Sequence, residues 1–264
     1  MDAFMNQQSP ARGLPEHSHP SQLVASASEG LPSPKISFEL PALSLFSSGQ
    51  IGREETERFI DQQFFKSYGA QHSEYMPWLI SMRQQGQLSA CAGVAFAVDK
   101  NPLFLERYLP SSIESLVSKN CGMPITRVQI AEVGNLAGSS FGGEHIGSSR
   151  LLYIVLASVL EEIGIEWMVF TATRTLLISL QRLGLKHCVL GDADESFLDD
   201  AERSRWGSYY EHQPRVVAAP LSSANESIRE RTQFAAIREH YASTIADMAS
   251  YLMLSALNGS SSAP

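Results

Sequence analysis

The stretch from Arg127 to Gly191 constrains the fold most strongly, because strand-like and helix-like segments alternate along it. Residues 127–134 alternate in polarity and are rich in β-branched side chains, which predicts a strand. Apolar residues at three- and four-residue spacing predict a helix over 149–163. A strand at 166–171, a helix at 173–183 and a strand at 186–190 complete the stretch. This βαβαβ order predicts an open sheet flanked by helices.

A glycine- and serine-rich loop, residues 135–149, separates the first strand from the first helix. Backbone N–H groups at a helix N-terminus are free of intrahelical partners, and the helix dipole favours an anion there. The loop therefore predicts an anion site, with an ordinary connecting loop as the alternative. Its candidate residues are Gly142, Gly143, Gly147, Ser148 and Ser149.

Residues 144–149 resemble the pyrophosphate loop of GNAT-type N-acyltransferases, in which Arg or Gln is followed by two residues, Gly, one residue, and Gly or Ala. Glu144 stands where that pattern has a basic or amide residue, and Ser149 replaces the last small apolar residue. The end of the second helix, with Gly184, is similar to another GNAT segment. Leu180 stands where those enzymes often carry a tyrosine general acid, so this role is not expected here.

Six separated segments, in the same order, resemble the thermostable hemolysin family across roughly residues 55–217. They are Tyr68-Gly-Ala70, Met76-Pro-Trp-Leu79, Leu103-Phe-Leu-Glu-Arg-Tyr-Leu109, Glu132-Val-Gly-Asn-Leu-Ala137, Phe170-Thr-Ala-Thr173 and Trp206-Gly-Ser-Tyr-Tyr210. The same layout resembles the acyl-homoserine-lactone (autoinducer) synthases, which are GNAT-fold enzymes that use acylated carrier proteins or acyl-CoA. Ala95 departs from it, since the related enzymes are expected to carry a substrate-anchoring arginine there.

These resemblances imply an α+β fold, an α/β/α sandwich of the GNAT-like acyltransferase type with a central mixed sheet flanked by helices. We predict a low-complexity tail over residues 1–35, the acyltransferase domain over 36–221, one long C-terminal helix over 222–256 and a tail over 257–264. The apolar stripe of the long helix either docks on its own domain or joins two subunits as a homodimer.

The resemblance also implies transfer of an acyl group, expected to be fatty-acyl, from an acyl-CoA or acyl-carrier-protein thioester to a small amine. Glu132 is the candidate general base, because a partly buried carboxylate can have a raised pKa. A structural carboxylate that binds the adjacent loop is the alternative for Glu132, and His145 is a rival base. A membrane-active hemolysin and an inactive GNAT-like binding module are the alternative functions.

Further site residues follow from the same hypothesis. Donor contacts are assigned to Gly134, Asn135, Leu136, Ala137 and Thr173, together with the loop glycines and serines. Substrate contacts are assigned to Glu106, Tyr108, Thr171, Trp206 and Tyr209. Trp206 and Tyr209 either pack on the sheet or line the acceptor pocket. The small residues of the strand predicted over 88–98, such as Gly93, indicate either close packing or room for an acyl or pantetheine arm.

Composition excludes several other classes of function. A net charge of −8 and a pI near 5.4 argue against nucleic-acid binding, which needs clustered Lys and Arg. We expect no permanently bound cofactor. We also expect no metal, because the acidic cluster over residues 192–200 lacks calcium-loop spacing. No window reaches the ~18 apolar residues of a membrane span and no secretion signal is visible, so we expect a cytoplasmic protein.

Overall fold

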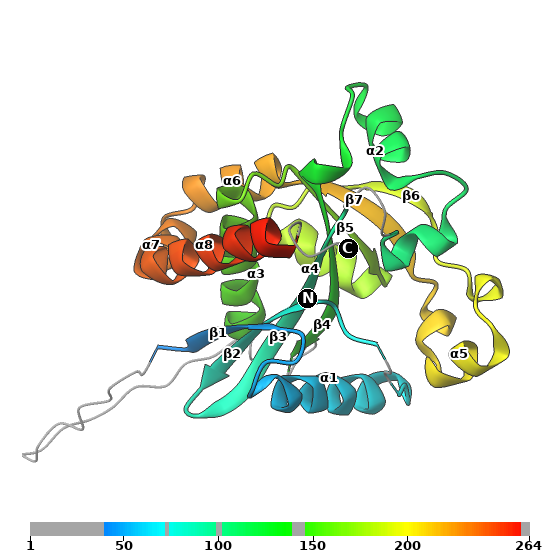
Figure 1. Ribbon diagram of the computed structural model, residues 1–264, viewed down its shortest axis with the longest axis horizontal. Helices are drawn as coiled ribbons and strands as arrows, with labels where there is room; N and C mark the ends of the chain where they lie inside the picture. Colours follow the sequence, from blue (N-terminus) through cyan, green and yellow to red (C-terminus); the bar gives the residue numbers. More distant parts are fainter. Residues whose placement is uncertain (1–39, 72–73, 99–101, 139–145, 260–264) are drawn as a thin grey trace, which may run out of the picture. The chain divides into compact units, whose positions relative to one another are not determined.

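The computed structural model describes residues 40–71, 74–98, 102–138 and 146–259. Within these ranges, seven strands form one sheet in the order β1-β2-β3-β4-β5-β7-β6 (Figure 1). The strands are β1 (Ala42–Ser47), β2 (Trp78–Gln84), β3 (Gln87–Phe96), β4 (Ile130–Gly138), β5 (Trp167–Ala172), β6 (Cys188–Asp192) and β7 (Arg215–Pro220). The β4–β5 pair is parallel and the other five pairs are antiparallel. The predicted α+β fold with a central mixed sheet is confirmed.

Eight α-helices accompany the sheet in the described residues. They are α1 (Arg53–Tyr68), α2 (Ile113–Cys121), α3 (Ile146–Glu162), α4 (Arg174–Arg182), α5 (Asp200–Arg205), α6 (Leu221–Glu230), α7 (Thr232–His240) and α8 (Ala242–Gly259). Short 3₁₀ turns lie at Phe104–Tyr108, Arg127–Gln129, Glu195–Phe197 and Tyr209–His212. In Figure 1, α1 (blue) lies below the ends of β2–β4, whereas α3 (green) and α6–α8 (orange to red) are grouped at the left.

The two faces of the sheet pack against different helices, because alternate strand residues point to opposite faces. Leu79 and Cys91 pack with Phe59 and Ile60 of α1. Their neighbours in β2 and β3 pack with α3 and the C-terminal helices. We call these surfaces the α1 face and the α3 face.

The helix α3 is buried on all sides over Leu151–Leu160. A helix that is apolar all round must be covered on the side that faces away from the sheet. The C-terminal helices provide this cover, since Phe234, Ile245 and Leu252 belong to the same apolar cluster as α3. The helices α6–α8 therefore share one hydrophobic core with α3 and the sheet.

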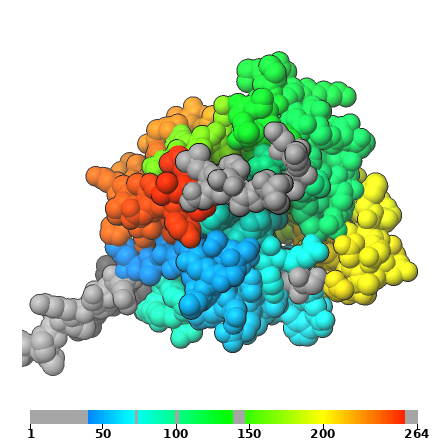
Figure 2. Space-filling view, in the orientation of Figure 1, coloured from blue at the N-terminus to red at the C-terminus, as the bar shows by residue number. Residues whose placement is uncertain are grey.

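The prediction of one C-terminal helix over 222–256 is wrong, because the chain breaks at two residues. Arg231 has extended backbone angles (φ −93°, ψ 110°), and Tyr241 leaves the helical region (φ −94°, ψ 13°). The apolar stripe is kept, but it folds over α3 and reaches the first strand, where the Tyr241 hydroxyl donates to the Pro41 carbonyl at 2.7 Å. Figure 2 shows the orange-to-red surface of these helices adjoining the blue surface of the N-terminal strand.

The predicted loop over 135–149 is shorter at both ends than expected. The strand β4 continues through Gly138, and α3 already begins at Ile146. The sequence also predicts a helix over 53–68 followed by Gly69, and a hairpin of strands over 78–83 and 88–98. The structure agrees, since Gly69 is the left-handed C-cap of α1 and β2 pairs with β3 as a hairpin. The turn residues Gln85 and Gly86 both have positive φ, as a type I′ turn requires. A further strand is predicted over 36–46; it is observed from Ala42, and its residues before position 40 lie outside the described residues.

Candidate functional site

The sheet opens between its two parallel strands. The pairing of β4 with β5 covers three residue pairs and ends at Glu132 and Val169. Beyond this point β4 stays paired to β3, but its register shifts, so that Asn135 and Leu136 together lie opposite Ala92. Asn135 has φ +46°, and such a bulge bends the strand that carries it. The bend explains why β4 separates from β5 and leaves backbone groups on its edge available to a ligand.

The Asn135 side chain is used within the protein. Its Oδ1 accepts a hydrogen bond from the Met76 N–H at 2.7 Å, and the backbone carbonyl of Asn135 accepts one from the Cys91 thiol at 3.6 Å. The bulge therefore holds the segment before β2 against the sheet. Asn135 was predicted as a donor contact, and its side chain has a structural partner here.

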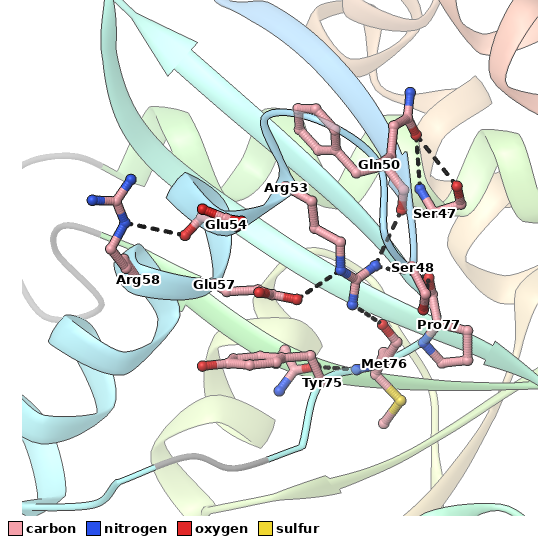
Figure 3. A network of polar contacts seen from close by, with 12 residues as sticks. Ser47, Ser48, Gln50, Arg53, Glu54, Glu57, Arg58, Tyr75, Met76 and Pro77 are labelled. Carbon is pink, nitrogen blue, oxygen red and sulfur yellow. Dashed lines mark hydrogen bonds and ion pairs between the residues drawn. The ribbon is translucent and has the colours of Figure 1, made fainter.

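Arg53 holds the same segment from the α1 side. Its buried guanidinium donates to the carbonyls of Met76 and Pro77 at 2.7 and 2.8 Å, and to Glu57 Oε1 at 2.7 Å. Figure 3 shows the guanidinium between Glu57 and these two carbonyls. Met76 is thereby fixed over β3 and β4 at the opening of the sheet.

Met76 explains the small residues of this region. A Cβ on Gly93 would lie 2.6 Å from the Met76 Cβ, and a Cβ on Gly134 would overlap the Met76 Cε. The alternative of close packing, predicted for Gly93, is thus confirmed. Gly134 adjoins the opening and lines the cavity described below.

Glu132 lies at the point where the two strands separate, on the α1 face opposite Ala95. Its side chain is only 3% exposed, and burial raises its pKa from 4.5 to about 8, although the N–H groups of Phe104 and Leu105 oppose this rise. Within the described residues, its Oε2 has no hydrogen-bond partner. A buried carboxylate with a free oxygen and a raised pKa is suited to proton transfer near neutral pH.

Aromatic rings form a wall beside Glu132. The ring centroids of Tyr68 and Tyr209 lie 5.2 Å apart, as do those of Trp206 and Tyr209. The Tyr209 hydroxyl donates to Thr171 Oγ1 at 3.5 Å. The segment is seated on the end of α1, since the Ser208 N–H donates to the Tyr68 carbonyl at 2.9 Å. Trp206 and Tyr209 both pack in this wall and line the cavity, so the two alternatives for them are compatible.

Two other predicted substrate contacts have structural partners instead. The Glu106 carboxylate accepts from Arg127 at 2.8 and 2.9 Å and from the Leu103 and Ile113 N–H groups. The Tyr108 hydroxyl lies 2.6 Å from that of Tyr210. Neither Glu106 nor Tyr108 lines the cavity.

A cavity of about 2350 Å³ passes through the opening and reaches both faces of the sheet. On the α1 face its lining includes Tyr68, Met76, Phe104, Glu132, Trp206 and Tyr209. On the α3 face it includes Leu152, Tyr153, Leu156, Met168, Leu180 and Leu252. One end of this space is therefore aromatic with an acidic group, and the other is mainly apolar.

Some of the remaining predicted donor contacts line the cavity and others do not. Leu136, Ala137, Ser149 and Thr173 line the cavity, and Thr173 also caps α4 by accepting from the Leu176 N–H at 3.5 Å. Gly147 is exposed, and Ser148 is buried with its hydroxyl 3.4 Å from Gln84 Oε1, so neither lines the cavity. The predictions for Gly142, Gly143 and His145 lie outside the described residues.

Several lining residues were missed by sequence reasoning. Arg150 directly follows the predicted anion loop, so its position was a usable signal. Tyr153 follows it one turn of α3 later. Arg231 and Leu252 come from the C-terminal helices, and no local pattern connects them to the loop. No described residues form a group of three His, Cys, Asp or Glu side chains able to hold a metal ion.

None of the described helices combines the length and the apolarity that crossing a membrane requires. A family model described as "Thermostable hemolysin" matches residues 46–225. No curated protein matches the sequence.

Three solved structures are among those similar to this chain. The AHL (acyl-homoserine-lactone) synthase LasI is 13% identical, over 69% of this chain and 90% of its own, with a TM-score of 0.46. The N-acyl amino acid synthase FeeM, from uncultured soil microbes, is 12% identical over 73% of this chain and 95% of its own, with a TM-score of 0.46. The CoA-dependent acyl-homoserine lactone synthase BjaI, with SAM and isopentyl-CoA, is 10% identical over 71% and 78%, with a TM-score of 0.41.

Proposed function

The chain belongs to the thermostable hemolysin family, and we propose that it is an acyltransferase that moves a fatty-acyl group from a carrier thioester to a small amine. The observation that carries this proposal is the place of Glu132. Its buried carboxylate adjoins the opening between β4 and β5. There one cavity connects an aromatic-lined end on the α1 face to a mainly apolar end on the α3 face.

The two ends of the cavity suit the two substrates of the proposed reaction. Leu152, Leu156 and Met168 on the α3 face would contact the acyl chain and the pantetheine arm of the donor, since these groups are mostly apolar. The amine would enter from the α1 face, among Tyr68, Trp206 and Tyr209. The thioester carbonyl would then lie in the opening, beside the unpaired edge of β4.

The reaction needs a base, an attacking amine and a polarised carbonyl. The amine nitrogen forms a bond to the thioester carbon while Glu132 accepts the amine proton, directly or through a water molecule. Backbone N–H groups near Gly134–Ala137 would stabilise the oxyanion of the tetrahedral intermediate. The C–S bond then breaks, and the proton held by Glu132 returns to the departing thiolate, so that the base is restored. Because Glu132 itself returns the proton, the proposed reaction needs no separate tyrosine acid, in agreement with the apolar Leu180 at that position.

The substitution Glu132→Gln tests the proposal, because it keeps the size of the side chain and removes the base. We expect acyl-CoA or acyl-carrier-protein binding to change less than about threefold and turnover to fall by about 100-fold or more. Binding is measured by calorimetry, and turnover by release of free thiol with a panel of amines. Glu166→Gln, at an exposed position outside the cavity, is the matched control and should retain full turnover.

Two results would contradict the proposal. Turnover of Glu132→Gln above a tenth of the wild-type rate would remove Glu132 as the base. Absence of binding of every acyl-CoA and acyl carrier protein to the folded wild-type protein would remove the acyltransferase function itself.

A further inference from the structure

Two arginines, Arg150 and Arg231, lie against Phe234 on the α3 side of the cavity, and Tyr153 lines the same cavity. The guanidinium carbons of Arg150 and Arg231 lie 5.6 and 5.1 Å from the centroid of the Phe234 ring. Arg150 and Tyr153 stand one turn apart near the start of α3, whereas Arg231 lies at the break between α6 and α7. All four residues line the cavity.

The positive charges of this group are not matched by carboxylates. Within the described residues, neither Arg150 nor Arg231 forms an ion pair with Asp or Glu. The Arg150 Nε is buried and has no hydrogen-bond partner there. Arg231 Nη1 donates to the Arg182 carbonyl at 3.0 Å, which leaves its other N–H groups for a further acceptor. Because both positive charges lie close to the Phe234 ring, an anion beside them is favourable.

Tyr153 adds an independent observation. Its side chain is 7% exposed and lines the cavity, and its buried hydroxyl has no partner among the described residues. Burial raises the pKa of Tyr153, and the charge of Arg231 opposes this rise, so the two groups interact electrostatically. A buried hydroxyl without a partner destabilises the protein unless a ligand accepts its hydrogen bond.

The backbone that carries Arg231 is held in place by packing, whereas the residue itself is exposed. Ser227 Oγ donates to the Leu183 carbonyl at 2.9 Å, and a Cβ on Gly184 would meet the Ser227 side chain. These contacts hold the end of α6 against the end of α4. Arg231 and Phe234 also lie beyond residue 225, where the family match ends.

We propose that Arg150, Tyr153 and Arg231 form a phosphate-binding site for the thioester donor. The inference rests on the proposed function, because it assigns the polar end of the same substrate. Guanidinium groups bind phosphate through paired, charge-assisted hydrogen bonds, and the Tyr153 hydroxyl supplies one more donor. The phosphate belongs either to the phosphopantetheine of a carrier protein or to the nucleotide part of CoA.

The test compares dissociation constants for CoA, 3′-dephospho-CoA, 4′-phosphopantetheine and phosphate-free pantetheine. Arg150→Gln and Arg231→Gln should each weaken binding of the phosphate-bearing ligands by about 10- to 100-fold, with pantetheine affinity changed less than about twofold. Arg229→Gln is the matched control, because Arg229 pairs with Glu161 at 3.0 Å and does not line the cavity. It should leave all four affinities unchanged.

The ligand series also identifies the source of the phosphate. Equal losses for 4′-phosphopantetheine and CoA would assign the site to the 4′-phosphate next to the pantetheine arm, which both donors share. A loss confined to CoA and dephospho-CoA would assign it to the nucleotide phosphates. Either pattern supports the site.

Tyr153→Phe separates a ligand contact from a structural role. We expect it to keep or raise the Tm of the ligand-free protein and to weaken phosphate-ligand binding by about 3- to 10-fold, since only an unsatisfied hydroxyl is removed. A lower Tm with unchanged affinity would remove Tyr153 from the site. Unchanged affinities in both arginine variants, or equal losses with pantetheine, would overturn the site while leaving the proposed function intact if Glu132→Gln still abolishes turnover.

Discussion

At the residue scale, we expect Glu132 to determine how both the proposed activity and the stability respond to pH. Its pKa in the folded protein is about 8, against an ordinary value of 4.5, because burial disfavours the charged carboxylate. Its ionised form is the base in the proposed reaction. We therefore expect kcat/KM to rise with pH to an inflection near 8, which Glu132→Gln should remove while other inflections persist. A wild-type inflection retained in Glu132→Gln would show that another group titrates.

Stability should change in the opposite direction over the same pH range. The folded protein keeps Glu132 protonated between pH 4.5 and 8, whereas the unfolded chain releases the proton, so the free energy of unfolding falls as pH rises. This contribution to stability is complete below pH 4.5 and is lost as the pH rises to about 8. It amounts to about 5 kcal/mol as an upper bound. Denaturation of Glu132→Gln and wild type at pH 5 and pH 8 checks this. The variant should gain relative stability at pH 8, and a constant difference would contradict the raised pKa.

At the element scale, the bulge of β4 and the Met76 segment form one unit. Asn135 and Arg53 hold Met76 in place, and Gly93 and Gly134 leave room for it. Gly134→Ala should destabilise the protein by about 1–3 kcal/mol, because its new methyl group overlaps the Met76 Cε. Met76→Ala removes that atom, so the double variant should recover most of this loss in a denaturation cycle. Strictly additive effects would show that Met76 is not the obstacle.

At the scale of the whole molecule, α3 connects the sheet to the C-terminal helices. Ile245 of α8 is 1% exposed within the same core, whereas Leu254 of the same helix is 59% exposed. Ile245→Ala should lower the free energy of unfolding by about 2–5 kcal/mol, and Leu254→Ala by less than about 0.5 kcal/mol. Urea denaturation measures both. Equal, small effects would mean that α8 contributes little to the core.

The sequence by itself determined the local elements and the place of the proposed base. Helix ends and turns depend on neighbouring residues, which is why Gly69 and the Gln85-Gly86 turn lie where the pattern predicts. Glu132 was found because it stands at a predicted strand end inside a recognisable segment.

Only the tertiary structure decided which distant residues meet. Three helices form in place of the single predicted C-terminal helix, because the all-apolar α3 must be covered on its outer side. This requirement outweighs local helix propensity at Arg231 and Tyr241. The same folding brings Arg231 to Arg150 and places Met76 on Gly93 and Gly134. Such contacts join residues far apart along the chain, so no periodicity or spacing within one segment encodes them.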